Sequence, residues 1–415
     1  MEIKEIKKNM RAEIGALCHD IERMDKDYLD ETINKIFDKW RRRNIEVDNT
    51  LRNKVIKELT DDFTGYGPIT ELFNDKSVTE IMINGPYQVY VERNGKKELA
   101  DIRFDDVMHL NYIVERMISP SGRRVDESSP YTDFSMPDGS RVNIIIPPVS
   151  AQGAVVTIRK FLHTIEKIED LTALGTIDER MAKFLVACVK SRLNILFSGA
   201  AGSGKTTTLG VLSSYIGEEE RIITIEDTLE LDLQQKHIVR LITKPANIDG
   251  KGEITPRDLF ANSLRMRPSR IILGEIRGVE ALDYLQALNS GHKGSLAVLH
   301  ASTPQGALMR LETMALYADL NLPAWIIRKQ ISSGLDLIVQ HEQFADGSRK
   351  ITYVTEVSGI NENNEIILRD IFRYEIAGVD DDNKSRGKFI AVDKPLFYHV
   401  LGERGVHLDE EIFKE

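Results

Sequence analysis

The sequence is short of cysteine, of long apolar runs and of basic charge, and each shortage excludes a class of protein. Only two of its 415 residues are cysteines, Cys18 and Cys188, and they lack the paired spacing of a zinc site. No apolar run approaches the ~20 residues that a membrane-spanning helix needs. The 55 lysines and arginines are outnumbered by 65 aspartates and glutamates, whereas nucleic-acid binding needs dense basic charge. We therefore expect a cytoplasmic protein without a zinc site, a membrane span or a nucleic-acid partner.

The order of hydrophobic patterns divides the chain into five stretches. Apolar residues recur at three- and four-residue steps over 1–60, which predicts a helical N-terminal segment. Alternating apolar residues and turn sequences over 61–162 predict an α+β domain with an antiparallel sheet. A linker is expected at 163–176. Strands and helices alternate over 177–375, which predicts an α/β domain with a mainly parallel sheet, and an acidic C-terminal tail is expected at 376–415.

A glycine-rich turn between an apolar strand and a helix predicts a phosphate-binding site. The sequence GAAGSGKT matches the P-loop pattern G-x-x-x-x-G-K-[ST]. In such a loop, backbone N–H groups and the helix N-terminus point at the phosphates. Lys205 would contact the β- and γ-phosphates, and the Thr206 hydroxyl would ligate Mg²⁺. The predicted cofactors are therefore ATP and Mg²⁺. The residues expected to bind them are Gly199, Ala200, Ala201, Gly202, Ser203, Gly204, Lys205, Thr206 and Thr207.

Acidic residues after two further apolar runs predict a metal ligand and a catalytic base. Glu275 follows the run RIIL, and a carboxylate at a strand end beside a P-loop can hold Mg²⁺ directly or through water. Arg277 follows closely and could sense the γ-phosphate or pair with a carboxylate. Glu226 and Glu230 lie in TIEDTLEL and are the candidates for the base that orients the attacking water.

Two histidines flank another apolar run, in SGHKGSLAVLHAST. Taken alone, His292 and His300 would more often be packing or capping residues, and their spacing predicts neither a zinc site nor a catalytic dyad. The small residues around them indicate a close backbone approach near a site.

Four motifs in a fixed order resemble those of one family. GAAGSGKT, TIEDTLEL, RIILGEIRG and SGHKGSLAVLHA resemble the Walker A, Asp box, Walker B and His box of the type II/IV secretion ATPases. From about residue 60 onward, segments such as SVTEIMINGPYQVYVERNG also resemble the CpaF/TadA branch, the ATPases of Flp (tight-adherence) pilus systems. The tetracysteine zinc module of some type II secretion ATPases has no counterpart in the sequence.

The resemblance implies a ring of six protomers, each with an N-terminal α+β domain joined to a RecA-like ATPase domain and ATP between the two. It implies that Glu230, with Glu226, is the catalytic group of the Asp box and that Glu275 is the Walker B acid. His292 and His300 would form the His box. Arginines of the N-terminal domain are expected to complete the nucleotide site, and the matching positions are Arg124, Arg141 and Arg159.

The function that follows is ATP hydrolysis coupled to Flp pilus assembly or protein secretion. The expected location is the cytoplasmic face of the membrane, with an inner-membrane platform protein as partner. The same fold would serve conjugation or effector type IV secretion, which is the alternative. A third reading, from another class, is a regulatory scaffold that binds ATP and hydrolyses it negligibly, and the intact Glu230 and Glu275 argue against it.

Overall fold

The computed structural model divides the chain into two compact units, Met1–Leu162 and His163–Glu415. Cys18 lies outside the residues that the structure describes, whereas Cys188 is buried. The described residues are 3–17, 26–41, 49–93, 95–160, 165–231, 233–244, 246, 251–318, 321–379 and 385–414.

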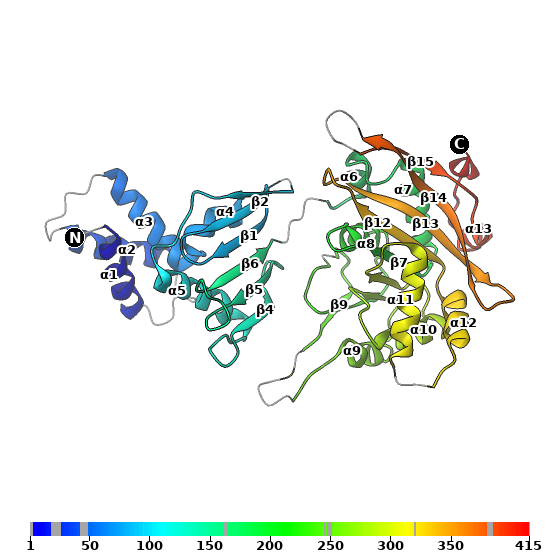
Figure 1. The fold of residues 1–415 in the computed structure, drawn as a ribbon, viewed down its shortest axis with the longest axis horizontal. Coiled ribbons are helices and arrows are strands. Elements are labelled where there is room, and N and C mark those ends of the chain that lie inside the picture. The colour runs from blue at the N-terminus through cyan, green and yellow to red at the C-terminus, as the bar shows by residue number, and fades with distance from the viewer. Residues whose placement is uncertain are drawn as a thin grey trace. The chain divides into compact units, whose positions relative to one another are not determined.

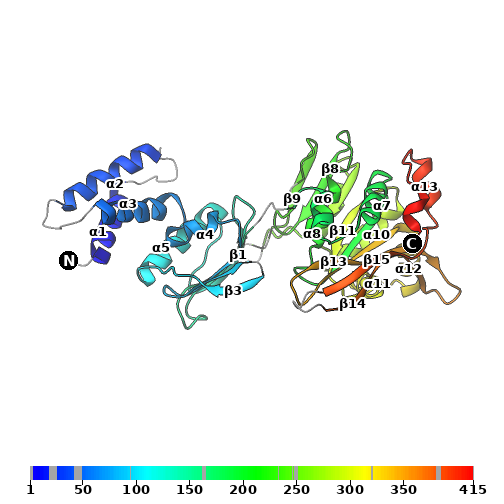
Figure 2. The same ribbon diagram turned by 90° about the horizontal axis from the view of Figure 1, so that it is seen from above.

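The first unit begins with three helices, as the apolar periodicity predicts. Their apolar stripes meet in a small core of its own, which includes Met10, Ile33 and Leu59. Figure 2 shows these helices packed together at one end of the unit. The helices of this unit are α1 (Ile3–Leu17), α2 (Lys26–Arg41), α3 (Asn49–Thr64), α4 (Thr70–Asn74) and α5 (Val107–Ile118).

The rest of the first unit is a six-stranded antiparallel sheet with the order β3-β2-β1-β6-β5-β4. Inward-facing residues alternate along β1, β5 and β6 and pack with the apolar face of α5. The predicted α+β domain with an antiparallel sheet is therefore confirmed. The strands are β1 (Val78–Asn84), β2 (Val89–Arg93), β3 (Lys96–Leu99), β4 (Tyr131–Ser135), β5 (Arg141–Ile145) and β6 (Val155–Arg159).

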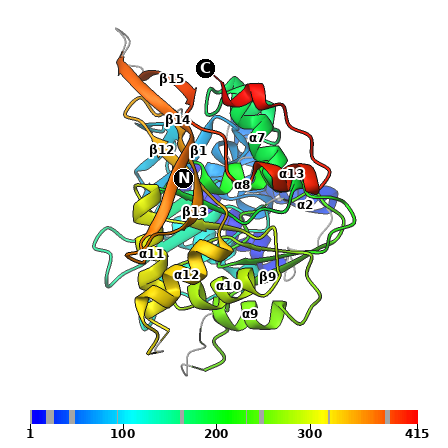
Figure 3. The same ribbon diagram turned by 90° about the vertical axis from the view of Figure 1, so that its right-hand side faces the viewer.

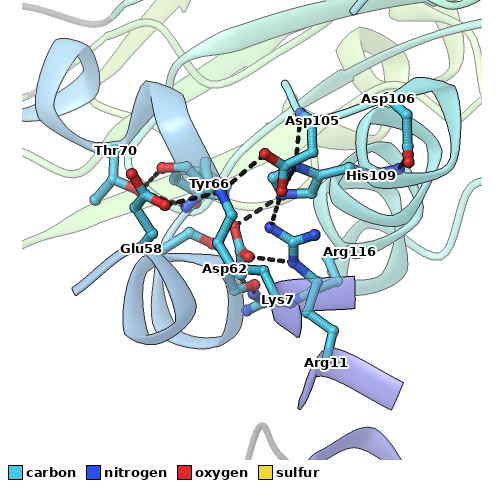
Figure 4. Close-up of polar contacts among 12 residues, drawn as sticks. Lys7, Arg11, Glu58, Asp62, Tyr66, Thr70, Asp105, Asp106, His109 and Arg116 are labelled. Atoms are coloured by element: carbon cyan, nitrogen blue, oxygen red, sulfur yellow. Dashed lines mark hydrogen bonds and ion pairs between the residues drawn. The ribbon is translucent and has the colours of Figure 1, made fainter. Parts of the chain in front are cut away.

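A buried ion cluster joins α1 to α3 and to the loop before α5 (Figure 4). Lys7 on α1 lies 2.8 Å from the carboxylates of both Glu58 and Asp105. One turn further along α1, Arg11 donates to Asp105 at 2.6 Å and pairs with Asp62. Asp62 is 1% exposed, so its charge depends on these partners rather than on water. The cluster fixes the helical segment to the sheet-bearing part of the unit.

The second unit mostly alternates strands and helices up to β12, continues as a β-meander from β12 to β15, and ends in α13 and a short 3-10 helix. Its helices are α6 (Ile168–Ala173), α7 (Glu179–Lys190), α8 (Lys205–Ser213), α9 (Pro256–Ser263), α10 (Glu280–Asn289), α11 (Pro304–Leu316), α12 (Ala324–Gly334) and α13 (Tyr398–Glu403). Its strands are β7 (Ile195–Gly199), β8 (Ile222–Glu226), β9 (Ile238–Ile242), β10 (Arg270–Leu273), β11 (Leu296–Leu299), β12 (Leu337–Gln343), β13 (Arg349–Ile360), β14 (Ile366–Val379) and β15 (Ser385–Ala391).

These strands form one sheet with the order β15-β14-β13-β12-β7-β11-β10-β8-β9. Figure 1 labels β15, β14, β13, β12, β7 and β9 of this sheet. The pairs from β12 to β9 are parallel, and the pairs from β12 to β15 are antiparallel. The predicted mainly parallel α/β domain is confirmed for the first part. In a parallel sheet the carboxyl ends of β7, β8, β10 and β11 meet at one edge. The P-loop, Glu226, Glu275 and His300 lie at or directly after these strand ends.

Helices cover both faces of this sheet (Figure 3). On one face, α6, α7, α8 and α13 share a core with alternate strand residues such as Ile195 and Phe197. On the other face, α9 to α12 share a core with Leu196 between them. β7, β8, β10 and β11 are buried along their whole length, because parallel strands between two helical layers have no solvent-facing side.

The C-terminal residues are part of the second unit rather than a separate tail. Strand β14 crosses residue 376, where the tail was expected to begin, and β15 pairs with it. Leu401 and Ile412 are buried in the core beneath α7. Apolar residues spread among acidic ones had hidden this packing in the sequence. In the part of the chain that the structure describes, no helix is long and apolar enough to cross a membrane.

Candidate nucleotide-binding site

The P-loop joins the end of β7 to the start of α8, and its glycines adopt a backbone that other residues avoid. Gly199, Gly202 and Gly204 all have positive φ, at 153°, 75° and 95°. A Cβ on Gly199 would lie 2.5 Å from the carbonyl oxygen of His341 on β12, so the close strand packing itself requires glycine. The loop ends at the N-terminus of α8, where unpaired N–H groups favour an anion.

Lys205, the first residue of α8, is buried and folds back over the loop. Its ammonium group donates to the carbonyl of Ala200 at 2.6 Å and lies 3.4 Å from Nδ1 of His300. Ser203 also donates its hydroxyl to the Ala200 carbonyl. A phosphate entering the loop would replace the Ala200 carbonyl as the partner of the ammonium group.

His300 follows β11 and links the P-loop lysine to the Walker B acid. Its Nε2 lies 3.2 Å from a carboxylate oxygen of Glu275. Lys205 can only donate, so Nδ1 accepts and Nε2 carries the proton in this arrangement. Partial burial and the nearby ammonium of Lys205 hold the pKa of His300 below its usual value. The imidazole is therefore neutral at physiological pH.

Glu275 follows β10, and its carboxylate is ionised. Burial alone would raise the pKa of Glu275, but the hydrogen bond and charge of Arg277 outweigh burial and lower it. Arg277 donates to Glu275 at 2.6 Å and lies 3.0 Å from Asp227 of the Asp box. The sequence left open whether Arg277 senses the γ-phosphate or pairs with a carboxylate. In the structure it pairs with two carboxylates.

The two Asp-box glutamates have different surroundings. Glu226 at the end of β8 is 3% exposed, and one carboxylate oxygen accepts backbone N–H groups of Glu230 and Leu231 at 2.8 and 2.9 Å. Its other oxygen accepts the Thr224 hydroxyl at 3.1 Å. Burial raises the pKa of Glu226 against these donors. Glu230 is half-buried. Because Glu226 accepts two backbone N–H groups, it stabilises the conformation of the loop after β8.

The donor set at this edge fits magnesium when a nucleotide supplies further oxygens. Thr206 is the second residue of α8, and Glu275 offers an ionised carboxylate. Mg²⁺ is usually held by one or two such groups together with substrate phosphates. Within the described ranges, no group of three or more His, Cys, Asp or Glu side chains is arranged to hold a metal without a substrate.

The structure does not bring His292 to this group of residues. It precedes β11, whereas His300 follows it, so the two histidines lie at opposite ends of the strand. His292 instead contacts the end of α10, with Nδ1 3.3 Å from the Ser290 hydroxyl. Sequence spacing could not separate the two, because both flank the same short apolar run.

The three expected arginines all belong to the first unit. Arg141 on β5 and Arg159 on β6 are direct cross-strand partners. Like charges at opposed positions repel, and an anion bound between two such groups would relieve that repulsion. Arg124 is exposed and pairs with Asp126 at 2.6 Å. Their proposed place at the nucleotide still rests on the resemblance.

Two residues beside the P-loop had no motif to reveal them. His341 on β12 lies 3.0 Å, through Nε2, from the Thr208 hydroxyl on α8. Arg349 at the start of β13 donates from Nε to the carbonyl of Gly202 at 2.7 Å. Both lie more than 130 residues from their partners in the chain. A single sequence carries no signal for contacts of that separation.

Comparison with known proteins places this arrangement among secretion proteins. The profile of the Type II/IV secretion system protein family matches residues 62–348. The Type IV secretion system protein VirB11 of Bartonella quintana is 34% identical over 335 residues, which cover 70% of this chain and 91% of that protein. A Mycobacterium tuberculosis relative named "Putative conjugal transfer protein" is 30% identical over 305 residues, covering 72% of this chain and 86% of the relative.

One solved structure that is similar to this chain is the VirB11 ATPase of the Brucella suis type IV secretion system in complex with sulphate. It is 28% identical, covers 72% of this chain and 96% of its own, and superposes with a TM-score of 0.40.

Proposed function

The chain belongs to the type II/IV secretion system protein family, and from this premise we propose that it is a ring-forming motor that hydrolyses MgATP to drive export through a type IV secretion or conjugal transfer machine. It is an ATPase of that family. The proposed location is the cytoplasmic face of the membrane, where a hexamer would act on a membrane partner of the machine.

One observation carries this proposal. A continuous polar chain runs from the Ala200 carbonyl through Lys205 and His300 to Glu275, and on through Arg277 to the Asp box. All four motifs therefore contribute to one set of bonded side chains. A protein that only bound nucleotide would need the P-loop alone, so the acids that belong to this set support hydrolysis as well as binding.

The reaction we propose uses positioning and charge rather than covalent chemistry. Lys205 leaves the Ala200 carbonyl for the γ-phosphate, and the N–H groups of the loop hold the remaining oxygens. Bound Mg²⁺ would neutralise the charge that develops on the phosphate oxygens, with Thr206 and Glu275 holding it. Glu230 orients the attacking water and accepts its proton, and Glu226 holds the Asp-box loop that carries Glu230.

The choice between export machines rests on the named relatives. Among the relatives reported above, the printed names are of type IV secretion and conjugal transfer proteins. This favours the alternative stated from the sequence over Flp pilus assembly, although the CpaF/TadA resemblance keeps pilus assembly as the second candidate. Deleting the gene separates them: loss of DNA or effector transfer with intact pili supports the first, and loss of pili supports the second.

Replacement of the P-loop lysine tests the ATPase assignment. Lys205→Ala should abolish phosphate release, because it removes the P-loop ammonium group that we propose contacts the β- and γ-phosphates. Turnover is measured by phosphate release on the purified oligomer, with Lys388→Ala on the exposed part of β15 as the matched control. Full activity in Lys205→Ala would reject the proposal.

A further inference from the structure

Two neighbouring residues at the start of β13 contact two distant parts of the second unit. Arg349 donates to the P-loop carbonyl of Gly202 at 2.7 Å. Lys350 donates from Nζ to the carbonyl of Gly175 at 2.6 Å. Successive side chains of a strand point to opposite faces, so adjacent positions can reach separate segments. Gly175 lies in the stretch 163–176 that was expected to be a linker. The structure instead has helix α6 there, with Ile168 and Leu171 buried in the core of the second unit.

The Lys350 ammonium group lies in a defined environment at Gly175. Helix α6 ends there with Gly175 in the left-handed region at φ 63°, and Thr176 donates back to Leu171. A Cβ on Gly175 would lie 3.1 Å from the ammonium of Lys350. That ammonium also sits 5.8 Å from the ring centre of Tyr374, and burial lowers the pKa of Lys350.

The backbone of β13 continues this attachment. Ile351 donates its N–H to the carbonyl of Thr176 at 2.9 Å. Side chain and backbone of β13 thus hold consecutive peptide groups of the segment that ends at α7. A displacement of the start of β13 would therefore also displace Gly175 and Thr176.

The contact at Gly202 acts on the peptide that faces the phosphates. The peptide between Gly202 and Ser203 is planar and trans, so its C=O and N–H point in opposite directions. When Arg349 holds the carbonyl of Gly202, the N–H of Ser203 is turned the other way. That N–H now makes only a long bond of 3.4 Å to the Ala200 carbonyl, and it is one of the groups a phosphate would engage.

We propose that the start of β13 links the nucleotide state of the P-loop to residues 171–176, where α6 ends near the start of the second unit, with Arg349 and Lys350 as its positioning residues. This regulation rests on the proposed ATPase function. Phosphate binding fixes the orientation of the Gly202–Ser203 peptide. The Gly202 carbonyl then accepts a stronger hydrogen bond from Arg349. The start of β13 becomes more ordered and stabilises residues 171–176.

Hydrogen–deuterium exchange on the full chain tests this link. Amides of 171–176 and of Ile351 should exchange about 3- to 10-fold more slowly when a non-hydrolysable ATP analogue and Mg²⁺ are bound, which corresponds to about one hydrogen bond. Arg349→Gln should still bind the analogue, with a KM for ATP raised about 3- to 10-fold, but should lose this response. Lys350→Met should lose it as well.

The controls separate the link from the ATPase function. Arg349 is exposed, so its replacement should leave the melting temperature unchanged. Lys388→Met removes an equivalent charge from β15 and should keep the full response. A wild-type response that persists in Arg349→Gln and Lys350→Met overturns the link, and so does a wild-type protein that binds the analogue without any response. A wild-type protein that binds no analogue overturns the proposed function itself.

Discussion

We propose different tasks for the two glutamates of the Asp box, although their chemistry is the same. Glu226 is buried and satisfies two backbone N–H groups and a hydroxyl. Glu230, four residues further on, is half-buried. A carboxylate fully engaged with backbone donors stabilises a loop, whereas one nearer to solvent can take a proton from water. Replacement of Glu230 should therefore affect the ATPase rate, whereas replacement of Glu226 should affect stability.

We predict that Glu230→Gln keeps its melting temperature and nucleotide affinity but loses about 10²–10⁴ in kcat, the usual worth of a general base. Glu226→Ala should lower stability, because each buried donor left without a partner costs about 1–3 kcal/mol. Thermal unfolding and phosphate release measured on both variants check this. Equal loss of stability in the two would contradict the assignment.

His341 should make stability depend on pH. Burial lowers the pKa of His341 to about 4, so the unfolded chain binds a proton below about pH 6.5 that the folded chain refuses until about pH 4. The contribution of His341 to the free energy of unfolding is therefore fully present above pH 6.5. It decreases as pH falls towards 4, by up to about 3 kcal/mol. Melting temperatures of His341→Gln should fall less steeply between pH 6.5 and 4, whereas the control His292→Gln should follow the wild type.

Helix α1 is held by a few polar contacts as well as by the buried side chains of Met10 and Ile14. Arg11→Met would leave Asp62, which is 1% exposed, with a charge that has lost its guanidinium partner. We expect a cost of about 3–5 kcal/mol and faster hydrogen exchange along α1. Lys39→Met breaks the exposed pair with Glu13 and should cost under about 1 kcal/mol. Similar losses in both variants would show that the cluster is not what holds the helix.

The same cluster has a defined pH window. Burial would raise the pKa of Asp105, but Lys7 and Arg11 outweigh it and hold that pKa below the usual value. Stability from Asp105 is therefore present above its unfolded pKa of about 3.9 and is lost as pH falls through the lower folded value. Burial likewise opposes, but does not cancel, the rise in the pKa of Lys7 caused by Asp105 and Glu58. Stability from Lys7 is complete below its unfolded pKa of about 10.4 and is lost as pH rises through the higher folded value.

The whole molecule should work only when both units contribute to a ring. The proposed arginines belong to the first unit and the P-loop to the second. If the arginines act on a neighbouring protomer, mixing Lys205→Ala with an Arg124→Gln/Arg141→Gln/Arg159→Gln variant should restore part of the ATPase rate. Each arginine that meets the transferring phosphate can be worth about 10³–10⁵ in rate, so either variant alone should be nearly inactive. No recovery in the mixture would place the arginines in their own protomer's site.

Local patterns revealed most of the chain's architecture. The P-loop, the strands around it and the helical start were predicted because each depends on residues close together in sequence: glycines at positive φ, apolar alternation, and helical spacing. The expected tail after residue 375 was different. Its short apolar pieces are buried because they pack on residues far away in the chain: Leu401 and Ile412 share a core with α7, and the ring of Phe413 contacts that of Phe184.

The sequence alone determined the P-loop motif at Gly199–Thr206, which predicts a phosphate site, and the acids that follow the neighbouring strands, since both depend on short motifs. Only the tertiary structure decided which members of those motifs meet. In the structure His300, but not His292, lies beside Lys205. Glu226 accepts backbone N–H groups, and Arg349 donates to the P-loop carbonyl of Gly202. The physical reason is that strand order in the sheet and the register of β12 with β7 are set by packing of the whole core, which no local pattern records.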